Sequence, residues 1–227
     1  LHAPDGFFSV PVALIMWAVA IAVVALSVRR ASRSFDERAI PLMGVTAAFI
    51  FAAQMVNFPV LGGTSGHLLG AVLAAILLGP WAGTLVMASV IAVQSLLFQD
   101  GGLLAMGANI VNMGMIGTIA GFAIYRALCG LLGGEERGRY PAAAVAAWSA
   151  VMLGALATSL ELAASGTSPL VVVLPAMLGV HIFIGVGEAL ITVAALGLIQ
   201  SARPDLLELR DARPAHAAPA SLEPSEP

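Results

Sequence analysis

Long apolar runs alternate along this chain with short stretches of glycine, proline, charged or polar residues. About 20 apolar residues suffice for a helix to cross a hydrocarbon core of ~30 Å. The runs predict seven membrane-spanning segments, at residues 11–28, 41–58, 67–79, 80–98, 105–128, 141–164 and 169–199. Gly79-Pro80 predicts a tight turn after the short third run, and Ser168–Pro175 predicts a loop or broken helix before the final span. The pattern is typical of an all-α, polytopic membrane helix bundle.

The two ends of the chain differ from the apolar runs. Leu1–Val10 has neither the basic stretch nor the cleavage-site pattern of a signal peptide, and we expect a short polar segment exported ahead of the first span. Residues 201–227 are rich in alanine, proline and glutamate and have no apolar periodicity, which predicts a disordered cytoplasmic tail. We therefore expect one transmembrane metal-binding domain over residues 1–200, followed by a tail over 201–227.

Composition and charge support a membrane protein and suggest its orientation. The chain is 59% hydrophobic and 10% charged, whereas a soluble domain is about 25% charged. All ten basic residues are arginines, and they follow the first, fifth and seventh runs: Arg29, Arg30, Arg33, Arg38, Arg126, Arg137, Arg139, Arg203, Arg210 and Arg213. With seven spans they fall on one side, which the positive-inside rule makes cytoplasmic. This predicts an external N-terminus and a cytoplasmic C-terminus.

The absence of lysine and the presence of only one cysteine exclude several kinds of chemistry. The chain contains no lysine, and a phosphate-binding P-loop or a Schiff base requires one. We therefore expect no ATP hydrolysis by this chain alone. Cys129 is the single cysteine, which rules out an internal disulfide framework and a multi-cysteine metal cluster.

The histidines are the main candidates for metal binding. Of the four, His216 lies in the predicted tail, whereas His2, His67 and His181 fall near the predicted outer side. A histidine in second position offers the terminal amine, its own backbone amide and its imidazole. Planar nitrogen sites suit Ni(II) or Cu(II), and Co(II) can be accommodated. His67, which follows a glycine-rich stretch, is the natural fourth donor. The alternatives are a surface histidine near a terminus and an interfacial histidine capped by its loop.

The other polar residues of the apolar runs predict a supporting set. His181 and Glu188 are seven residues apart, hence on one helix face and about 10 Å apart along it. Ionisable groups within a membrane are costly and usually serve an interior site. We interpret both as supporting or pathway residues, with a structural polar pair as the alternative. Asn109 is placed to hydrogen-bond a ligand histidine. The set is completed by Asn112, a candidate for hydrogen bonding between helices, and Glu161.

Several short motifs together resemble those of a known family. They are Leu1–Phe7 (LHAPDGF), Thr64–His67 (TSGH), Gly107–Asn109 (GAN), Glu161–Ala163 (ELA), and His181 followed by Gly185–Thr192 (GVGEALIT). They are similar to motifs of the CbiM/NikM family, the substrate-specific membrane component of energy-coupling-factor transporters for cobalt and nickel. The resemblance covers roughly residues 1–200.

The resemblance implies seven spans and an outer N-terminal segment that tucks into the bundle. It implies that Ni(II) or Co(II), as transported substrate, is held by the Leu1 amine, the amide and side chain of His2, and His67, with Asn109, His181 and Glu188 in support. Family members begin with methionine. Leu1 need not abolish binding, because any first residue supplies the amine. Leu1 either reflects a leucine-type codon used as a start, in which case the real residue is methionine, or follows residues missing upstream, in which case the chelate cannot form.

The resemblance also implies a transport component rather than an enzyme. Its implied partners are a transmembrane coupling protein, two cytoplasmic ATPase subunits, a possible small accessory membrane subunit and membrane lipid, with no nucleic acid and no resident cofactor. Its implied location is the inner cell membrane of a prokaryote. Two rival interpretations stay open: an intramembrane enzyme using His181 and Glu188, and a metal-free structural or channel subunit.

Overall fold

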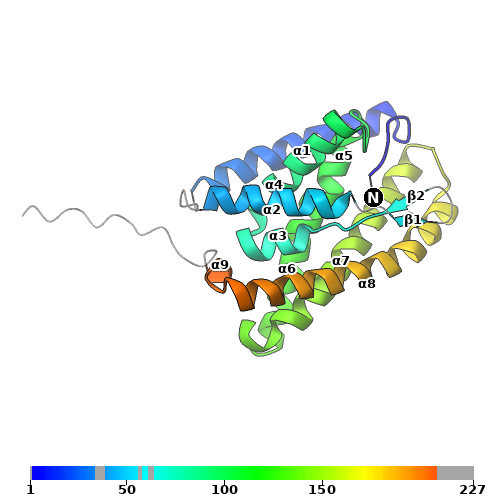
Figure 1. Ribbon diagram of the computed structural model, residues 1–227. Coiled ribbons are helices and arrows are strands. Elements are labelled where there is room, and N and C mark those ends of the chain that lie inside the picture. The colour runs from blue at the N-terminus through cyan, green and yellow to red at the C-terminus, as the bar shows by residue number, and fades with distance from the viewer. Residues whose placement is uncertain (1, 34–38, 56–57, 61–63, 209–227) are drawn as a thin grey trace, which may run out of the picture.

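The computed structural model describes residues 2–33, 39–55, 58–60 and 64–208, and nearly all of this part of the chain is helical (Figure 1). The helices are α1 (Val10–Ala31), α2 (Ala39–Gln54), α3 (Ala71–Leu78), α4 (Pro80–Val93), α5 (Met106–Asn109), α6 (Gly121–Leu131), α7 (Glu135–Ala164), α8 (Leu170–Ala202) and α9 (Asp205–Glu208). Two π-helical segments, η1 (Gln94–Phe98) and η2 (Ile110–Ala120), continue α4 and join α5 to α6.

Five of these helical stretches are long and apolar enough to cross a membrane. They are Val10–Ala31, Pro80–Phe98, Met106–Leu131, Glu135–Ala164 and Leu170–Ala202. The second and third predicted spans correspond to α2, with 16 residues, and α3, with eight. The predicted all-α membrane bundle is therefore confirmed, whereas the count of seven spans and the orientation of the termini remain predictions.

The end of the chain departs from the sequence prediction. The loop predicted over Ser168–Pro175 is shorter than expected: Ser168 and Pro169 lie in the turn before α8, but α8 begins at Leu170 and runs on through Pro175. The predicted tail begins too early, since α8 extends to Ala202 and residues 205–208 form α9. Leu207 is buried among the core residues, which explains why α9 stays with the bundle. Residues 209–227 lie outside the described part of the chain.

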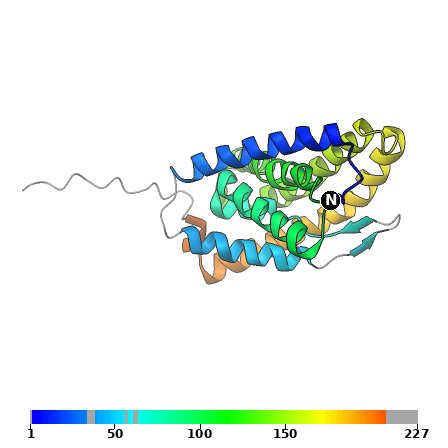
Figure 2. The same ribbon diagram turned by 90° about the horizontal axis from the view of Figure 1, so that it is seen from above.

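A small hairpin replaces the loop predicted between the second and third spans. Strand β1 (Phe58–Val60) pairs antiparallel with β2 (Thr64–Gly66), with Phe58 opposite Gly66 and Val60 opposite Thr64. In two perpendicular views the hairpin, the N-terminus and the α7–α8 turn lie at one end of the bundle, and α9 lies at the other (Figures 1 and 2). The hairpin thus delivers the chain to His67 at the end where the N-terminal segment lies.

The packing is that of a membrane bundle, with small or apolar residues inside and large apolar side chains outside. All eight residues of α3 are buried, and so is a stripe of alanines on α7 that includes Ala143 and Ala147. Large apolar side chains such as Val171 and Phe183 are 83% and 77% exposed. Since a soluble protein rarely exposes such residues together, these outer faces are suited to lipid.

The glycines Gly117 and Gly121, four residues apart, allow a close approach to α3. A Cβ at Gly117 would lie 2.6 Å from the Cβ of Ala71, and one at Gly121 would lie 2.6 Å from Cγ2 of Val72. We expect Gly121→Val to destabilise the bundle by about 1–3 kcal/mol through overpacking. Thermal unfolding in detergent checks this, with Gly130→Ala as the control because no atom lies near a Cβ there. An unchanged melting temperature for Gly121→Val would contradict the packing.

Candidate metal site

The N-terminal segment is held inside the bundle by hydrogen bonds to its backbone. Ala3, which is buried, donates its N–H to Oδ1 of Asn109 at 3.0 Å and accepts from Nδ2 of the same side chain at 3.2 Å. The N–H of Gly102 also donates to the Ala3 carbonyl, at 3.1 Å. The side-chain amide of Asn109 thus pairs with both backbone groups of Ala3, as a neighbouring strand would, and this fixes the position of the segment. Ala3, and therefore the adjacent His2, has a defined position.

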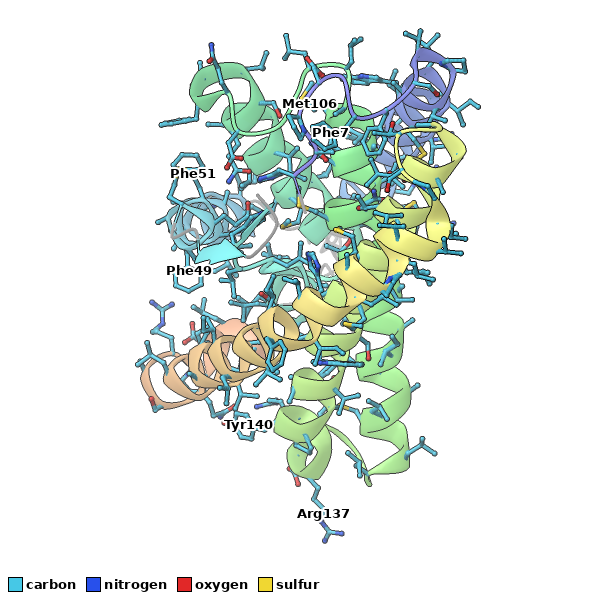
Figure 3. All side chains as sticks on the ribbon, turned by 90° about the vertical axis from the view of Figure 1, so that its right-hand side faces the viewer. Phe7, Phe49, Phe51, Met106, Arg137 and Tyr140 are labelled. Atoms are coloured by element: carbon cyan, nitrogen blue, oxygen red, sulfur yellow. The ribbon has the colours of Figure 1, made fainter. Side chains whose placement is uncertain are left out.

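Asp5 holds the same segment against the loop between η1 and α5. Its carboxylate accepts the backbone N–H groups of Leu103, Leu104 and Ala105 at 2.8–3.1 Å. The hydroxyl of Thr167, in the α7–α8 turn, donates to the carbonyl of Phe7. Figure 3 looks onto this end of the molecule, where Phe7 and Met106 lie in the upper part of the view.

His2 and His67 meet as a stacked pair. Their ring centroids are 4.6 Å apart and the rings are inclined by only 24°. The N-terminal segment brings in His2, and the exit of the β hairpin brings in His67, so residues 65 positions apart in the sequence come into contact. The His67 side chain is buried, and that of His2 is 4% exposed.

The ring nitrogens of this pair are largely without hydrogen bonds. Nδ1 of His67 lies 2.8 Å from the carbonyl of Leu68 and donates to it, because a carbonyl only accepts. The tautomer of His67 is thereby fixed with the lone pair on Nε2. That Nε2 and Nε2 of His2 are both buried, and neither has a hydrogen-bond partner among the described residues. Nδ1 of His2 is also buried, but it lies next to the Asp100 carboxylate. An unpaired buried polar group costs about 1–3 kcal/mol, so two such nitrogens on stacked rings call for a functional explanation.

The electrostatics favour neutral imidazoles, which are the form that binds metals. Burial lowers the pKa of His2 and lowers the pKa of His67 well below its usual value. Oδ1 of Asp100 lies 3.4 Å from Nδ1 of His2. This contact lowers the pKa of Asp100 and partly opposes the effect of burial on His2. The lone pairs of the two rings are therefore available near neutral pH, beside one carboxylate.

The predicted supporting residues Asn109, Glu188 and His181 hydrogen-bond to backbone groups. Asn109 bonds to the backbone of Ala3 and not to a histidine ring, which corrects the expectation that it fixes a tautomer. Glu188 accepts from the N–H groups of Leu69 and Gly70, both at 2.7 Å. His181 donates Nδ1–H to the carbonyl of Met177, and its Nε2 is buried without a partner.

Asn112 and Glu161 form a separate contact between helices. Nδ2 of Asn112 on η2 donates to Oε2 of Glu161 at 2.7 Å and to the hydroxyl of Thr158 at 3.2 Å, both on α7. Hydrogen bonding between helices, which the sequence suggested for Asn112, is therefore what the structure shows. Within the described residues, no hydrogen bond joins His181 to Glu188, the pair invoked for an enzyme.

Four polar residues near the site were missed from the sequence, namely Asp5, Gln54, Gln94 and Asp100. Asp100 begins an Asp-Gly-Gly turn, a signal that could have placed it next to the N-terminal segment. Gln54 and Gln94 are uncharged polar residues within apolar runs and are completely buried. Leu1 lies outside the described residues. Among the residues that the structure describes, no group of three or more His, Cys, Asp or Glu side chains is arranged to hold a metal.

A bundle of apolar helices with a buried pair of available imidazoles at one end is the architecture of a membrane protein that handles a transition metal. A model described as the "cobalt uptake substrate-specific transmembrane region" (CbiM) matches residues 2–206. The chain belongs to this family. It is accordingly a multi-pass membrane component of cobalt or nickel transport rather than an enzyme.

Individual relatives agree with the family. The chain is 39% identical, over 93% of its own length and 70% of the relative's, to a putative fused nickel transport protein of Archaeoglobus fulgidus. It is 31% identical, over 91% of its length and 61% of the relative's, to the cobalt transport protein CbiM of Geobacter sulfurreducens. A crystal structure of a truncated transition metal transporter superposes with a TM-score of 0.82 at 32% identity, covering 88% of this chain and 99% of that one.

Proposed function

We propose that this chain captures Ni(II) or Co(II) at an outward-facing nitrogen site and delivers it inward. The observation that carries the proposal is the stacked His2–His67 pair, in which the Nε2 atoms of both rings are buried and have no hydrogen-bond partner among the described residues. Imidazole suits both metals, and the relatives include proteins described as nickel and as cobalt transporters. In this proposal the metal is the cargo, and its residence in the site is temporary.

The remaining ligands in this proposal are backbone nitrogens. Two imidazoles leave two positions of a four-coordinate planar site to be filled, and the Leu1 amine and the His2 amide stand next to one of those imidazoles in the sequence. Asn109, Asp5 and Asp100 would then act by holding the N-terminal segment in place. His181 and Glu188 would act from α8.

Energy for uptake would come from partners of the energy-coupling-factor type. These are a transmembrane coupling protein and two cytoplasmic ATPase subunits, with a possible small accessory membrane subunit. A chain without lysine has no P-loop of its own, which supports an external source of ATP hydrolysis. The arginine distribution supports an N-terminus outside and a C-terminus in the cytoplasm. The archaeal and bacterial relatives support the inner cell membrane of a prokaryote as the location.

Calorimetric titration with Ni(II) and Co(II) in detergent tests the capture role. One sample is cleaved to release a free Leu1 amine, and the other keeps a few extra residues before Leu1. The proposal predicts one metal per chain in the first sample and much weaker binding in the second, since extension removes the amine. Equal binding by both samples would exclude the amine as a ligand. Binding by neither would contradict the capture role.

Asn109 offers a graded test of how the segment supports the site. Asn109→Ala removes both hydrogen bonds to Ala3. Asn109→Asp keeps the oxygen that accepts the N–H of Ala3 and loses the amide group that donates to the carbonyl of Ala3. We expect Asn109→Ala to weaken Ni(II) binding by about 10–100-fold, the usual cost of losing an outer partner of a metal site. Asn109→Asp is expected to fall between Asn109→Ala and the wild type in the same titration. Wild-type affinity in both variants would show that holding Ala3 does not matter.

A further inference from the structure

The backbone that follows His67 is held on both sides by buried side chains. Glu188 on α8 accepts the N–H groups of Leu69 and Gly70 through its two carboxylate oxygens, both at 2.7 Å. Gln54 on α2 donates Nε2–H to the carbonyl of Leu69, also at 2.7 Å. Glu188 is 2% exposed and Gln54 is fully buried. Leu69 therefore has both its N–H and its C=O bound by residues of two other helices.

The hydrogen bonds around Leu69 continue to η1 and from there to Asp100, which lies beside His2. Nε2 of Gln94 donates to Oε1 of Gln54 at 2.9 Å, and Gln94 is also fully buried. Gln94 begins η1, and the carbonyl of Gln94 accepts the N–H of Asp100, the residue beside His2. One continuous chain of hydrogen bonds thus runs from Glu188 through Leu69, Gln54 and Gln94 to Asp100.

Gly70 makes this geometry possible. Its φ of +74° is left-handed, and a Cβ at this position would lie 2.9 Å from Cγ1 of Ile50. A glycine is required here because other residues rarely adopt this backbone and none would fit beside Ile50. The left-handed turn presents two successive N–H groups to one carboxylate, immediately before α3 begins at Ala71.

We propose that Glu188 is a positioning residue for His67, and that with Gln54 and Gln94 it forms a clamp on Leu69 and Gly70. This inference rests on the proposed function. His67 is two residues from Leu69, so a displacement of the clamped backbone moves the imidazole. Each carboxyl oxygen of Glu188 accepts one backbone N–H, and the clamp is the means by which α8 and α2 act on the metal site.

Glu188→Gln is the direct test, because the amide keeps the size of the side chain but replaces one acceptor oxygen with a donor that faces an N–H. We expect Ni(II) affinity, measured by calorimetry on the full chain, to fall about 10–100-fold. Thr192→Val is the matched control, since Thr192 is a buried polar residue one turn further along the same helix. It is expected to change Ni(II) affinity by less than about 2-fold.

A double-mutant cycle separates positioning from a general structural role. If Glu188 acts through His67, Glu188→Gln changes affinity by less than about 2-fold when His67→Ala is already present. If Glu188 only stabilises the fold, its effect is the same in both backgrounds, and the inference is overturned. The cycle requires that His67→Ala still binds Ni(II) weakly. Higher protein and metal concentrations make such weak binding measurable.

Gln54→Met tests the clamp from the other side and serves if Glu188→Gln does not fold. It is expected to weaken Ni(II) binding about 3–10-fold, less than Glu188→Gln, because Gln54 makes one hydrogen bond to the clamped backbone and Glu188 makes two. Unchanged affinity in a folded clamp variant, with normal wild-type binding, would overturn this inference alone. No Ni(II) binding by the wild type would overturn the proposed function and this inference with it.

Discussion

Replacing His67 with alanine is expected to lower Ni(II) affinity by on the order of 1,000-fold, more than the 10–100-fold cost of losing an outer partner. The physical reason is that His67 supplies a lone pair on Nε2 whose availability is fixed by the bond from Nδ1 to the Leu68 carbonyl. His2→Ala is expected to have a comparable effect, because its ring is the other member of the stacked pair.

His216→Ala is the control for these variants, since the sequence places this histidine in the polar C-terminal region. Its Ni(II) affinity is expected to equal that of the wild type. Calorimetry checks all three variants, with thermal unfolding of the apo proteins to show that they are folded. Wild-type affinity in both His2→Ala and His67→Ala would place the metal elsewhere and would contradict the proposed site.

Gly102→Ala is expected to weaken Ni(II) binding as much as the loss of Asn109 or Glu188 does, although Gly102 has no side chain that could bind a metal. A Cβ at Gly102 would overlap the backbone nitrogen and the carboxylate of Asp5. Asp5 would have to move, which disturbs its three hydrogen bonds to the loop and the bond from Gly102 to Ala3. We expect Ni(II) affinity to fall about 10–100-fold, because the segment that carries His2 loses its position.

Gly187→Ala provides the matched control for this steric effect. No atom lies near a Cβ at Gly187, which is on α8. Alanine is favoured over glycine in a helix by about 1 kcal/mol, so this variant is expected to bind Ni(II) normally and to unfold at a slightly higher temperature. Normal Ni(II) binding by Gly102→Ala would show that the close approach of the loop to Asp5 is not needed.

The fold was largely predictable because membrane helices leave a strong hydropathy signal. The apolar runs located every long helix, and Gly79-Pro80 marked the turn between α3 and α4. Hydropathy does not show how far a helix extends through the membrane, so the eight-residue helix α3 could not be distinguished from a complete membrane span. The continuity of α8 through Pro175 was also missed, since a single proline can be tolerated within a long helix.

The site was predictable only in part. His2 and His67 could be singled out because histidine is rare in this chain and each lies in a recognisable motif. Their contact depends on how the N-terminal segment folds back, and this depends on Asp5, Asn109 and Gly102, which are contacts between distant parts of the chain. The buried glutamines Gln54 and Gln94 have no sequence signal beyond their polarity. Glu188 was found as an unusual charge, but its backbone partners could not be predicted.

X-ray absorption at the nickel edge of the loaded wild-type protein tests the central claim most directly, because it counts the imidazoles bound to the metal. The account predicts a planar nitrogen site with two imidazoles in the wild type and one in the residual complex of His67→Ala. A wild-type spectrum with oxygen or sulfur ligands, or an imidazole count that His67→Ala leaves unchanged, would contradict it.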